Sequence, residues 1–406
     1  MDKQKTLKRI SYGAMAVLIV SMMAATVLES INGTDFALRW VYHNPVFIAL
    51  WGVVAVAGLW FLLARGGARK PFTLLLHGAF VLILAGALVT HLCGRSGMIH
   101  LREGAPTAAF ELDDESPATL PFSLELREFR IEYDPGTRNV SDYVSELTLR
   151  DPEPRDITIS MNHILKYQGY RFYQADYDED GQGSILAVSR DPWGVGITYA
   201  GYLLLLISMV GYFFQSDTTY DDARRAIRRR RTPGSGRRVW RIVLIVAVCA
   251  LLLLWWLDAF PKGPLMPVLR SPLLFLHMIP IMVSYALFGV LFVLGIVGLL
   301  VRREVSERLR NVSLVMLCPA VFLLTFGTFL GAVWANISWG NYWAWDPKET
   351  WALVTLLVYS FPLHGKALKA FDNPRFFHAF LVVAFLCVLA TYFGVNLLLG
   401  GMHSYA

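Results

Sequence analysis

The chain has 406 residues, of which 55% are hydrophobic and only 17% are charged. With a mean hydropathy of +0.47, this composition excludes an ordinary soluble globular protein and indicates a polytopic membrane protein. The formal net charge is +6, but the basic residues gather in short loops beside apolar segments, so we expect no nucleic acid to bind.

Nine apolar segments are long enough, at roughly 20 residues, to cross a hydrocarbon core of about 30 Å. We therefore predict a polytopic α-helical membrane protein with about nine transmembrane helices and one external β-rich domain. The first segment follows a basic amino terminus, as a signal peptide does, but it lacks a small-residue cleavage site and is interpreted as a retained anchor. The predicted spans are residues 10–28, 45–64, 72–92, 195–215, 241–257, 273–300, 313–335, 350–367 and 376–398.

The predicted loops differ in charge between the two sides of the membrane. The short loops on one side carry 23 Lys and Arg residues, and those on the other side carry four. Positive residues favour the cytoplasmic side. We therefore place the amino terminus in the cytoplasm and, after nine crossings of a bacterial cytoplasmic (inner) membrane, the carboxyl terminus outside. The basic run 224–231 is interpreted as an anchor on anionic membrane lipid.

One long segment, about residues 93–194, differs in character from the apolar segments around it. Its runs at 122–132, 143–150 and 157–161 alternate apolar and polar residues and are bounded by Pro, Gly and Asp clusters. This pattern predicts a small antiparallel β-rich domain on the external side.

The basic segment 216–240, which contains TPGSG, predicts a flexible cytoplasmic linker between two halves. Residues 1–215 contain four predicted spans and residues 241–406 contain five, so the junction is where two separate subunits could have been joined. The four cysteines form no Cys-x-x-Cys pair, so any thiol chemistry would belong to a thiol-reducing partner.

The segment 339–353, WGNYWAWDPKETWAL, lies between two apolar segments and is rich in tryptophan. Aromatic residues at this density form a flat apolar platform with a polar rim, which suits a flat amphiphilic ligand such as haem. The alternative is an ordinary interfacial aromatic belt. Asp346 is expected to orient the loop or to cap the helix that starts at Pro347. The predicted haem-binding residues here are Trp339, Gly340, Tyr342, Trp343, Trp345 and Asp346.

Four histidines fall into two tiers. His77 lies about six residues, or roughly 9 Å, into its span, and His364 lies at a comparable height. His277 and His403 lie at the external ends of two other spans. Haem iron accepts two axial imidazoles, so two such pairs would hold haem first inside and then outside. A lone histidine in a span more often bonds a neighbouring helix. The remaining histidines are interpreted as structural or surface residues: His43, His91, His100, His163 and His378.

Longer motifs resemble a known pair of proteins. SPLLFLHMIPIMVSYALF at 271–288, GVNLLLGGMHSYA at 394–406 and the tryptophan-rich loop, which resembles the "WWD" signature of haem-handling proteins, are similar to the CcsA/ResC component of System II cytochrome c maturation. MNHILKYQGYRFYQADYD at 161–178 and SILAVSRDPWG at 184–194 resemble the ResB component. The chain therefore resembles a fused ResB/CcsA (CcsBA-type) haem exporter and ligase.

The resemblance implies that the chain exports haem b and attaches it through thioether bonds to the Cys-x-x-Cys-His motif of apocytochrome c, as a holocytochrome c synthase of the haem lyase type. It implies that His277 and His403 are the catalytic residues and axial ligands of an outer haem, and that His77 and His364 ligate an inner one. A thioredoxin-like thiol reductant is the further implied partner. The ResB-like part is smaller than in many relatives, which leaves open how the acceptor is bound.

Two other functions remain alternatives. A haem transporter or chaperone that delivers haem to a separate ligase would share the tryptophan-rich signature. A b-type electron-transfer subunit usually places two histidines about 13–14 residues apart on one span. The four histidines singled out above lie on four different segments, which argues against the electron-transfer subunit.

Overall fold

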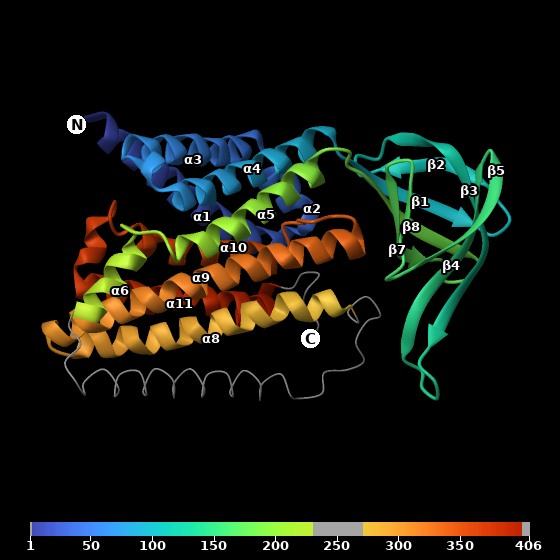
Figure 1. Cartoon of the computed structure of the whole chain (residues 1–406). Coiled ribbons are helices and arrows are strands. Elements are labelled where there is room, and N and C mark those ends of the chain that lie inside the picture. Colours follow the sequence, from blue (N-terminus) through green and yellow to red (C-terminus); the bar gives the residue numbers. More distant parts are fainter. Residues whose placement is uncertain (1, 230–270, 400–406) are drawn as a thin grey trace.

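The computed structural model describes residues 2–229 and 271–399, as a bundle of helices with a β-sheet domain at one end (Figure 1). The sheet follows the fourth helix and precedes the fifth, so both helices meet it with one end. We call this end of the bundle the β-domain end and the opposite one, where the amino terminus lies, the distal end.

Helices account for all of the described chain outside the sheet except short connections. The α-helices are α1 (Asp2–Asn32), α2 (Thr34–Ala37), α3 (Pro45–Ala64), α4 (Pro71–Cys93), α5 (Gly194–Tyr212), α6 (Thr219–Arg229), α8 (Pro272–Leu300), α9 (Arg303–Trp339), α10 (Pro347–Ser360) and α11 (Pro374–Leu389). Shorter 3₁₀ or π segments are η1 (Leu38–Tyr42), η2 (Gly67–Arg69), η4 (Phe361–His364), η5 (Lys369–Asp372) and η6 (Ala390–Leu399).

Seven helices in the described ranges are long and apolar enough to cross a membrane, so the fold is that of a multi-pass membrane protein. The predicted span 241–257 lies outside the described residues. The predicted span 350–367 is not confirmed as one α-helix, because α10 has 14 residues and ends at Ser360, and the chain continues directly as the 3₁₀ helix η4 (Phe361–His364). Pro362 has no N–H to continue the α-helical hydrogen bonds. The count of nine spans is therefore not confirmed.

Three helices start with the same local device. A side-chain oxygen of Asn44, Asp346 or Asn373 accepts a hydrogen bond from the backbone N–H two residues later, and a proline follows each cap at the first helical position. The cap satisfies one of the free N–H groups of the first turn, and proline has no N–H there to leave unpaired. These Asx-Pro pairs therefore determine where α3, α10 and α11 begin.

The two halves of the chain pack against one another within the bundle. Helix α1 contacts α10, and α6 contacts α9. In the buried α1–α10 contact, the indole Nε1 of Trp351 donates to the Thr26 hydroxyl at 3.1 Å. Helices α4 and α5 approach closely because Gly86 has no side chain; a Cβ there would lie 2.2 Å from Thr198 Oγ1. Small residues allow such close backbone approach between membrane helices.

The predicted β-rich domain is confirmed as one antiparallel sheet with the strand order β5-β4-β3-β2-β1-β8-β7-β6. Alternate residues point into a core of Leu, Ile, Val and Phe side chains, as in β1. The two edge strands are joined by a short connection, in which Ser160 and His163 exchange backbone hydrogen bonds of 2.9 and 3.1 Å. The strands are β1 (Arg95–Arg102), β2 (Thr107–Leu112), β3 (Pro117–Tyr133), β4 (Val140–Asp151), β5 (Glu153–Ser160), β6 (Leu165–Tyr167), β7 (Tyr170–Tyr177) and β8 (Gly183–Arg190).

Candidate functional site

The distal half of the bundle contains a histidine pair from the two halves of the chain. The rings of His77, on α4, and His364, at the end of η4, have centroids 5.9 Å apart and planes 87° apart. Both side chains are half-buried. The ring of Tyr12, from α1, lies 6.0 Å from His364. Three segments far apart in sequence therefore meet around this pair.

Both imidazoles are oriented by the same local bond. Nδ1 of His77 lies 2.8 Å from the carbonyl oxygen of Thr73, and Nδ1 of His364 lies 2.9 Å from that of Ser360. A carbonyl only accepts, so each Nδ1 donates its proton and each Nε2 keeps a free lone pair. Metal-binding histidines are usually held in this way. Two imidazoles on one metal ion have centroids about 6 Å apart, since each metal–nitrogen bond is about 2 Å long.

An ion-pair network closes the distal end beside this pair. The Asp217 carboxylate accepts from Lys366 and pairs with Lys70 at 2.6 Å. Arg65 donates to the Lys366 carbonyl oxygen at 3.1 Å. Hydrogen bonds from Lys366 and then Lys70 lower the pKa of Asp217 to about 2. The network ties the segment after His364 to the amino-terminal half of the chain.

At the β-domain end, the tryptophan-rich loop is held by the first turn of α10. Asp346 accepts from the Lys348 backbone N–H at 3.0 Å, so this predicted site residue caps the helix. Glu349 accepts from the Ala344 N–H at 3.0 Å, and the Thr350 hydroxyl donates to the Trp345 carbonyl at 3.2 Å. These bonds fix Trp345 at a φ of +59°, a conformation that costs a non-glycine residue about 1–3 kcal/mol.

Aromatic residues of the amino-terminal half support the loop. Trp345 stacks on Tyr42, with centroids 4.5 Å apart and planes 10° apart, and meets Trp343 edge-on at 5.8 Å. Tyr342 is only 7% exposed, and its hydroxyl donates to Thr90 Oγ1 at 3.0 Å. Tyr342 therefore anchors the loop to α4, whereas half-buried Trp343 and Trp345 remain partly open.

The indole N–H of Trp343 is a buried donor with no acceptor among residues 2–229 and 271–399. A buried donor without a partner costs about 1–3 kcal/mol. A ligand with a carboxylate or carbonyl group would satisfy it. On the other side of the loop, Lys348 Nζ donates to Asn396 Oδ1 of η6 at 2.9 Å.

A chain of aromatic contacts connects His277 to the first residue of the tryptophan-rich loop. Its ring stacks on Trp334, with centroids 5.6 Å apart, and Trp334 meets Trp339 at 4.8 Å. Gly331 allows this approach, because a Cβ there would lie 3.2 Å from His277 Cδ2. Its predicted partner, His403, lies outside the described residues, so the pairing of the two stays a prediction.

The β-domain holds the start of the loop in place. Arg171 donates to Asn336 Oδ1 at 3.2 Å, and the Tyr173 hydroxyl donates to the Asn336 carbonyl at 3.1 Å. The Ser189 hydroxyl donates to the Gly340 carbonyl at 3.3 Å. Gly340 has a φ of +79°, and a Cβ there would lie 2.4 Å from Tyr173 Cε2. Gly340 is therefore required both by its backbone conformation and by the approach of β7.

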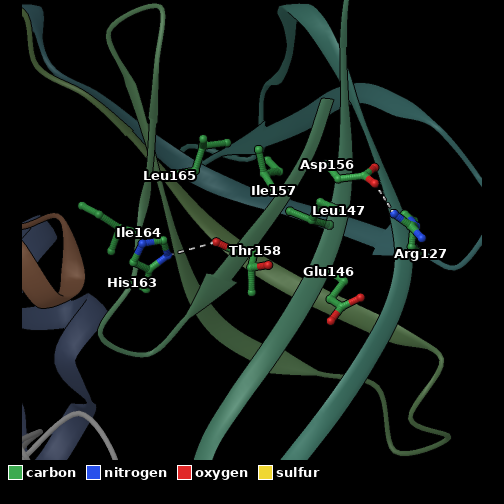
Figure 2. Close-up of a pocket in the computed structure, with 9 residues that line it drawn as sticks. All are labelled: Arg127, Glu146, Leu147, Asp156, Ile157, Thr158, His163, Ile164 and Leu165. Atoms are coloured by element: carbon green, nitrogen blue, oxygen red, sulfur yellow. Dashed lines mark hydrogen bonds and ion pairs between the residues drawn. The ribbon is translucent and has the colours of Figure 1, made fainter. Parts of the chain in front are cut away.

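A hollow of about 530 Å³ lies on the β-domain. In Figure 2, Leu147, Ile157 and Leu165 line it, and an Arg127–Asp156 ion pair of 2.5 Å lies on one side. Met161, between β5 and β6, packs with Trp334 and Trp339. The connection between the two edge strands of the sheet therefore links this hollow to the tryptophan-rich loop.

Several residues that build these arrangements were not predicted from the sequence. Tyr12, Tyr42, Thr90 and Asn336 lie far along the chain from the residues they contact. In the sequence, Tyr42 and Tyr12 are indistinguishable from ordinary aromatic residues near the ends of spans. No local sequence pattern predicts a role for Thr90 or Asn336. Of the five histidines interpreted as structural, His378 is buried, and its Nε2 bonds the Ser306 carbonyl at 3.0 Å.

Comparison with known proteins assigns the two halves to two families. The family model described as "Cytochrome C assembly protein" matches residues 229–403, and the one described as "ResB-like family" matches residues 51–187. Protein NrfI of Wolinella succinogenes is 41% identical over 152 residues, which are 35% of this chain and 17% of NrfI.

Two further relatives are named cytochrome c biogenesis protein CcsA. The one from Parasynechococcus marenigrum is 38% identical over 179 residues, covering 35% of this chain and 58% of the relative. The one from Chlamydomonas reinhardtii is 37% identical over 155 residues, covering 35% of this chain and 43% of the relative. The chain thus spans less than two thirds of the length of these relatives.

Proposed function

This chain is a fusion of a ResB-like and a CcsA-type region and belongs to the proteins of cytochrome c biogenesis, and from this premise we propose that it exports haem and attaches it covalently to apocytochrome c. Haem b is the substrate, and the acceptor is the Cys-x-x-Cys-His motif. The membrane is the bacterial cytoplasmic membrane, with the distal end on the cytoplasmic side and the β-domain outside.

The observation that carries this proposal is the pairing of His77 with His364. Their centroids are 5.9 Å apart, and each Nδ1 donates to a backbone carbonyl. Haem iron needs two axial ligands with free nitrogen lone pairs, and this pair would supply them. His77 and His364 would hold haem on the cytoplasmic side, with Tyr12 against the ring of His364.

The second position for haem lies at the β-domain end. His277 and His403 would supply the axial ligands, and Trp339, Trp343 and Trp345 would pack against the porphyrin. The Trp343 indole N–H, buried without an acceptor among the described residues, would bond a haem propionate. Gly340 and Asp346 would set the turn of the loop, and Tyr342 would hold it against α4.

The chemistry needs positioning more than a nucleophile from this chain. Each acceptor thiol adds across a haem vinyl group. The sulfur atom forms a covalent bond to one vinyl carbon and the thiol hydrogen atom forms one to the other carbon, with no net change of oxidation state. The chain would hold the vinyl edge towards the incoming peptide and exclude water from it. The acceptor thiols must be reduced, which requires a thioredoxin-like partner.

The test uses a bacterial host that lacks its own cytochrome c maturation genes. This chain is expressed there with an apocytochrome bearing Cys-x-x-Cys-His, and haem is stained on a denaturing gel. We expect covalent haem with the wild-type chain and with His100→Ala, and none with His277→Ala or His403→Ala. If the chain purifies with haem but yields no covalent product, delivery of haem to a separate ligase replaces the proposal.

A further inference from the structure

A second histidine pair lies at the β-domain end of the bundle. His43 follows η1, and His91 is in the last turn of α4; their ring centroids are 5.4 Å apart with planes 48° apart. Both side chains are exposed. Neither imidazole makes a hydrogen bond within the two described ranges of the chain. The four ring nitrogens are therefore not committed to the fold, unlike Nδ1 of His77 and of His364.

The two pairs share one helix. His91 follows His77 by 14 residues on α4, which places it about 21 Å further along and about 40° around the helix axis. The same side of α4 therefore carries one histidine of each pair, with His364 completing the first and His43 the second. This spacing, which is typical of helices that carry two haems in line, was missed because His91 was interpreted as a surface residue.

The residues that precede the second pair contact the tryptophan-rich loop. Tyr42, just before His43, stacks on Trp345 at 4.5 Å. Thr90, just before His91, accepts from the Tyr342 hydroxyl at 3.0 Å. Each histidine of the pair therefore directly follows, in the sequence, a residue that contacts the loop.

The number of ligands indicates what the pair would bind. Structural zinc sites use four protein ligands and catalytic sites three, and no group of three or more His, Cys, Asp or Glu that could hold a metal ion occurs among the described residues. Haem brings four nitrogens of its own, and its iron needs only two further ligands. Two imidazoles without a third protein ligand among the described residues therefore fit haem better than a bare metal ion.

We propose that His43 and His91 form a third bis-imidazole site, which receives haem after the His77–His364 pair and before the tryptophan-rich loop. This inference rests on the proposed function, since it assumes that haem moves from the distal to the β-domain end. The step forms two iron–nitrogen bonds and breaks two, with no change of oxidation state. The chain thereby offers haem a ligand pair at the far end of the helix that holds it first.

The His43–His91 pair is suited to binding haem transiently. A hydrogen bond to the second ring nitrogen strengthens metal binding by about 10–100-fold, and His43 and His91 lack such bonds within the described chain. A transit site must bind well enough to receive its cargo and weakly enough to release it.

The experiment measures haem bound to the purified full-length chain. The parent is His277→Ala, which is expected to stop haem from settling at the loop. His43→Ala with His91→Ala is added to the parent, and His100→Ala is the matched control, because His100 is exposed on β1 and pairs with Asp178. Haem per chain and the low-spin absorption of bis-imidazole haem are recorded, together with monodispersity.

We expect the added pair of substitutions to lower the haem per chain and the low-spin absorption relative to the parent, and His100→Ala to lower neither. Added imidazole should restore the low-spin spectrum when His43→Gly replaces His43→Ala. Unchanged haem content and spectrum would overturn the inference, as would zinc binding that depends on His43 and His91 while haem content does not. If the wild-type chain and the parent both lack haem, the proposed function fails first, so the two failures are distinguishable.

Discussion

The proposed site residues at the two ends of the helix bundle are held in place by different kinds of contact. At the distal end, His77 and His364 are each oriented by a carbonyl four residues earlier in the chain. At the β-domain end, the tryptophan-rich loop depends on Tyr42, Thr90 and Tyr173, which come from three distant segments; Tyr173 acts through Asn336, just before the loop.

The two ends therefore differ in how many distant segments of the chain must pack together to form them. The orientation of each distal imidazole is a local property of its helix, and it needs only that two helices pack together. The loop instead requires contacts from three segments of the amino-terminal half of the chain: η1, α4 and the β-domain. We therefore expect substitutions at the two ends to have separable effects on haem binding and on haem attachment.

After the complete loss expected from His277→Ala or His403→Ala, the largest effect is expected from His77→Ala or His364→Ala. Loss of one axial ligand should lower covalent haem on a co-expressed acceptor at least about tenfold, and haem that purifies with the chain should fall as well. Haem-stained gels and haem per chain measure both, with His100→Ala as the control. Normal attachment by both variants would separate the distal pair from the haem path.

Gly340→Ala should affect only the β-domain end. Its φ of +79° and the 2.4 Å approach of Tyr173 Cε2 leave no room for a methyl group, so strain of about 1–3 kcal/mol should displace the loop. We expect attachment to fall several-fold while haem at the distal pair is retained. Gly289→Ala in α8 is the matched control, because a Cβ there meets nothing within 4 Å. Equal loss from both variants would argue for general misfolding.

Tyr342→Phe should have a smaller effect at the same end. It removes the 3.0 Å bond to Thr90 but keeps the buried ring, so the cost is about 0.5–1.5 kcal/mol. This cost in free energy corresponds to a drop in haem attachment of about two- to tenfold. Haem bound at the distal pair should be unchanged. Tyr133→Phe, on an exposed tyrosine of the sheet, should leave attachment unaltered. An effect of Tyr342→Phe on distal haem would show that the two ends are coupled.

The smallest effect is expected from Asp217→Asn at the distal end. Lys366 and Lys70 lower the pKa of Asp217 from 3.8 to about 2. A carboxyl group whose pKa is lower in the folded state stabilises the fold when the pH is above its pKa in the unfolded state. This stabilisation is lost as the pH falls towards its pKa in the folded state. The side chain is 68% exposed, so the gain should be under about 1 kcal/mol.

This prediction is checked by thermal unfolding in detergent. Asp217→Asn should lower the Tm slightly at pH 5, and the difference from wild type should vanish between about pH 4 and pH 2. High salt should reduce the difference at pH 5. A difference that stays constant across this range would show that the ion pairs do not stabilise the distal end.

Local patterns in the sequence were sufficient for most single elements. Alternating apolar residues predicted β3, β4 and β5, and long apolar runs predicted α3, α4 and α8, because each pattern reports which face of one element is buried. The same approach did not predict the form of residues 350–367. An apolar run shows that a segment is buried, but it does not show that the α-helix gives way to a 3₁₀ helix at Phe361.

By itself, the sequence determined which residues lie at which height: His77 and His364 towards one end, and the tryptophan-rich loop at the other. These heights follow from counting along helices of fixed rise. Only the tertiary structure decided which residues meet: His77 with His364, His43 with His91, Tyr42 with Trp345, and Asn336 with the sheet. The physical reason is that such contacts depend on how each helix is rotated and packed against its neighbours, and that follows from the summed packing of many side chains, which no local pattern contains.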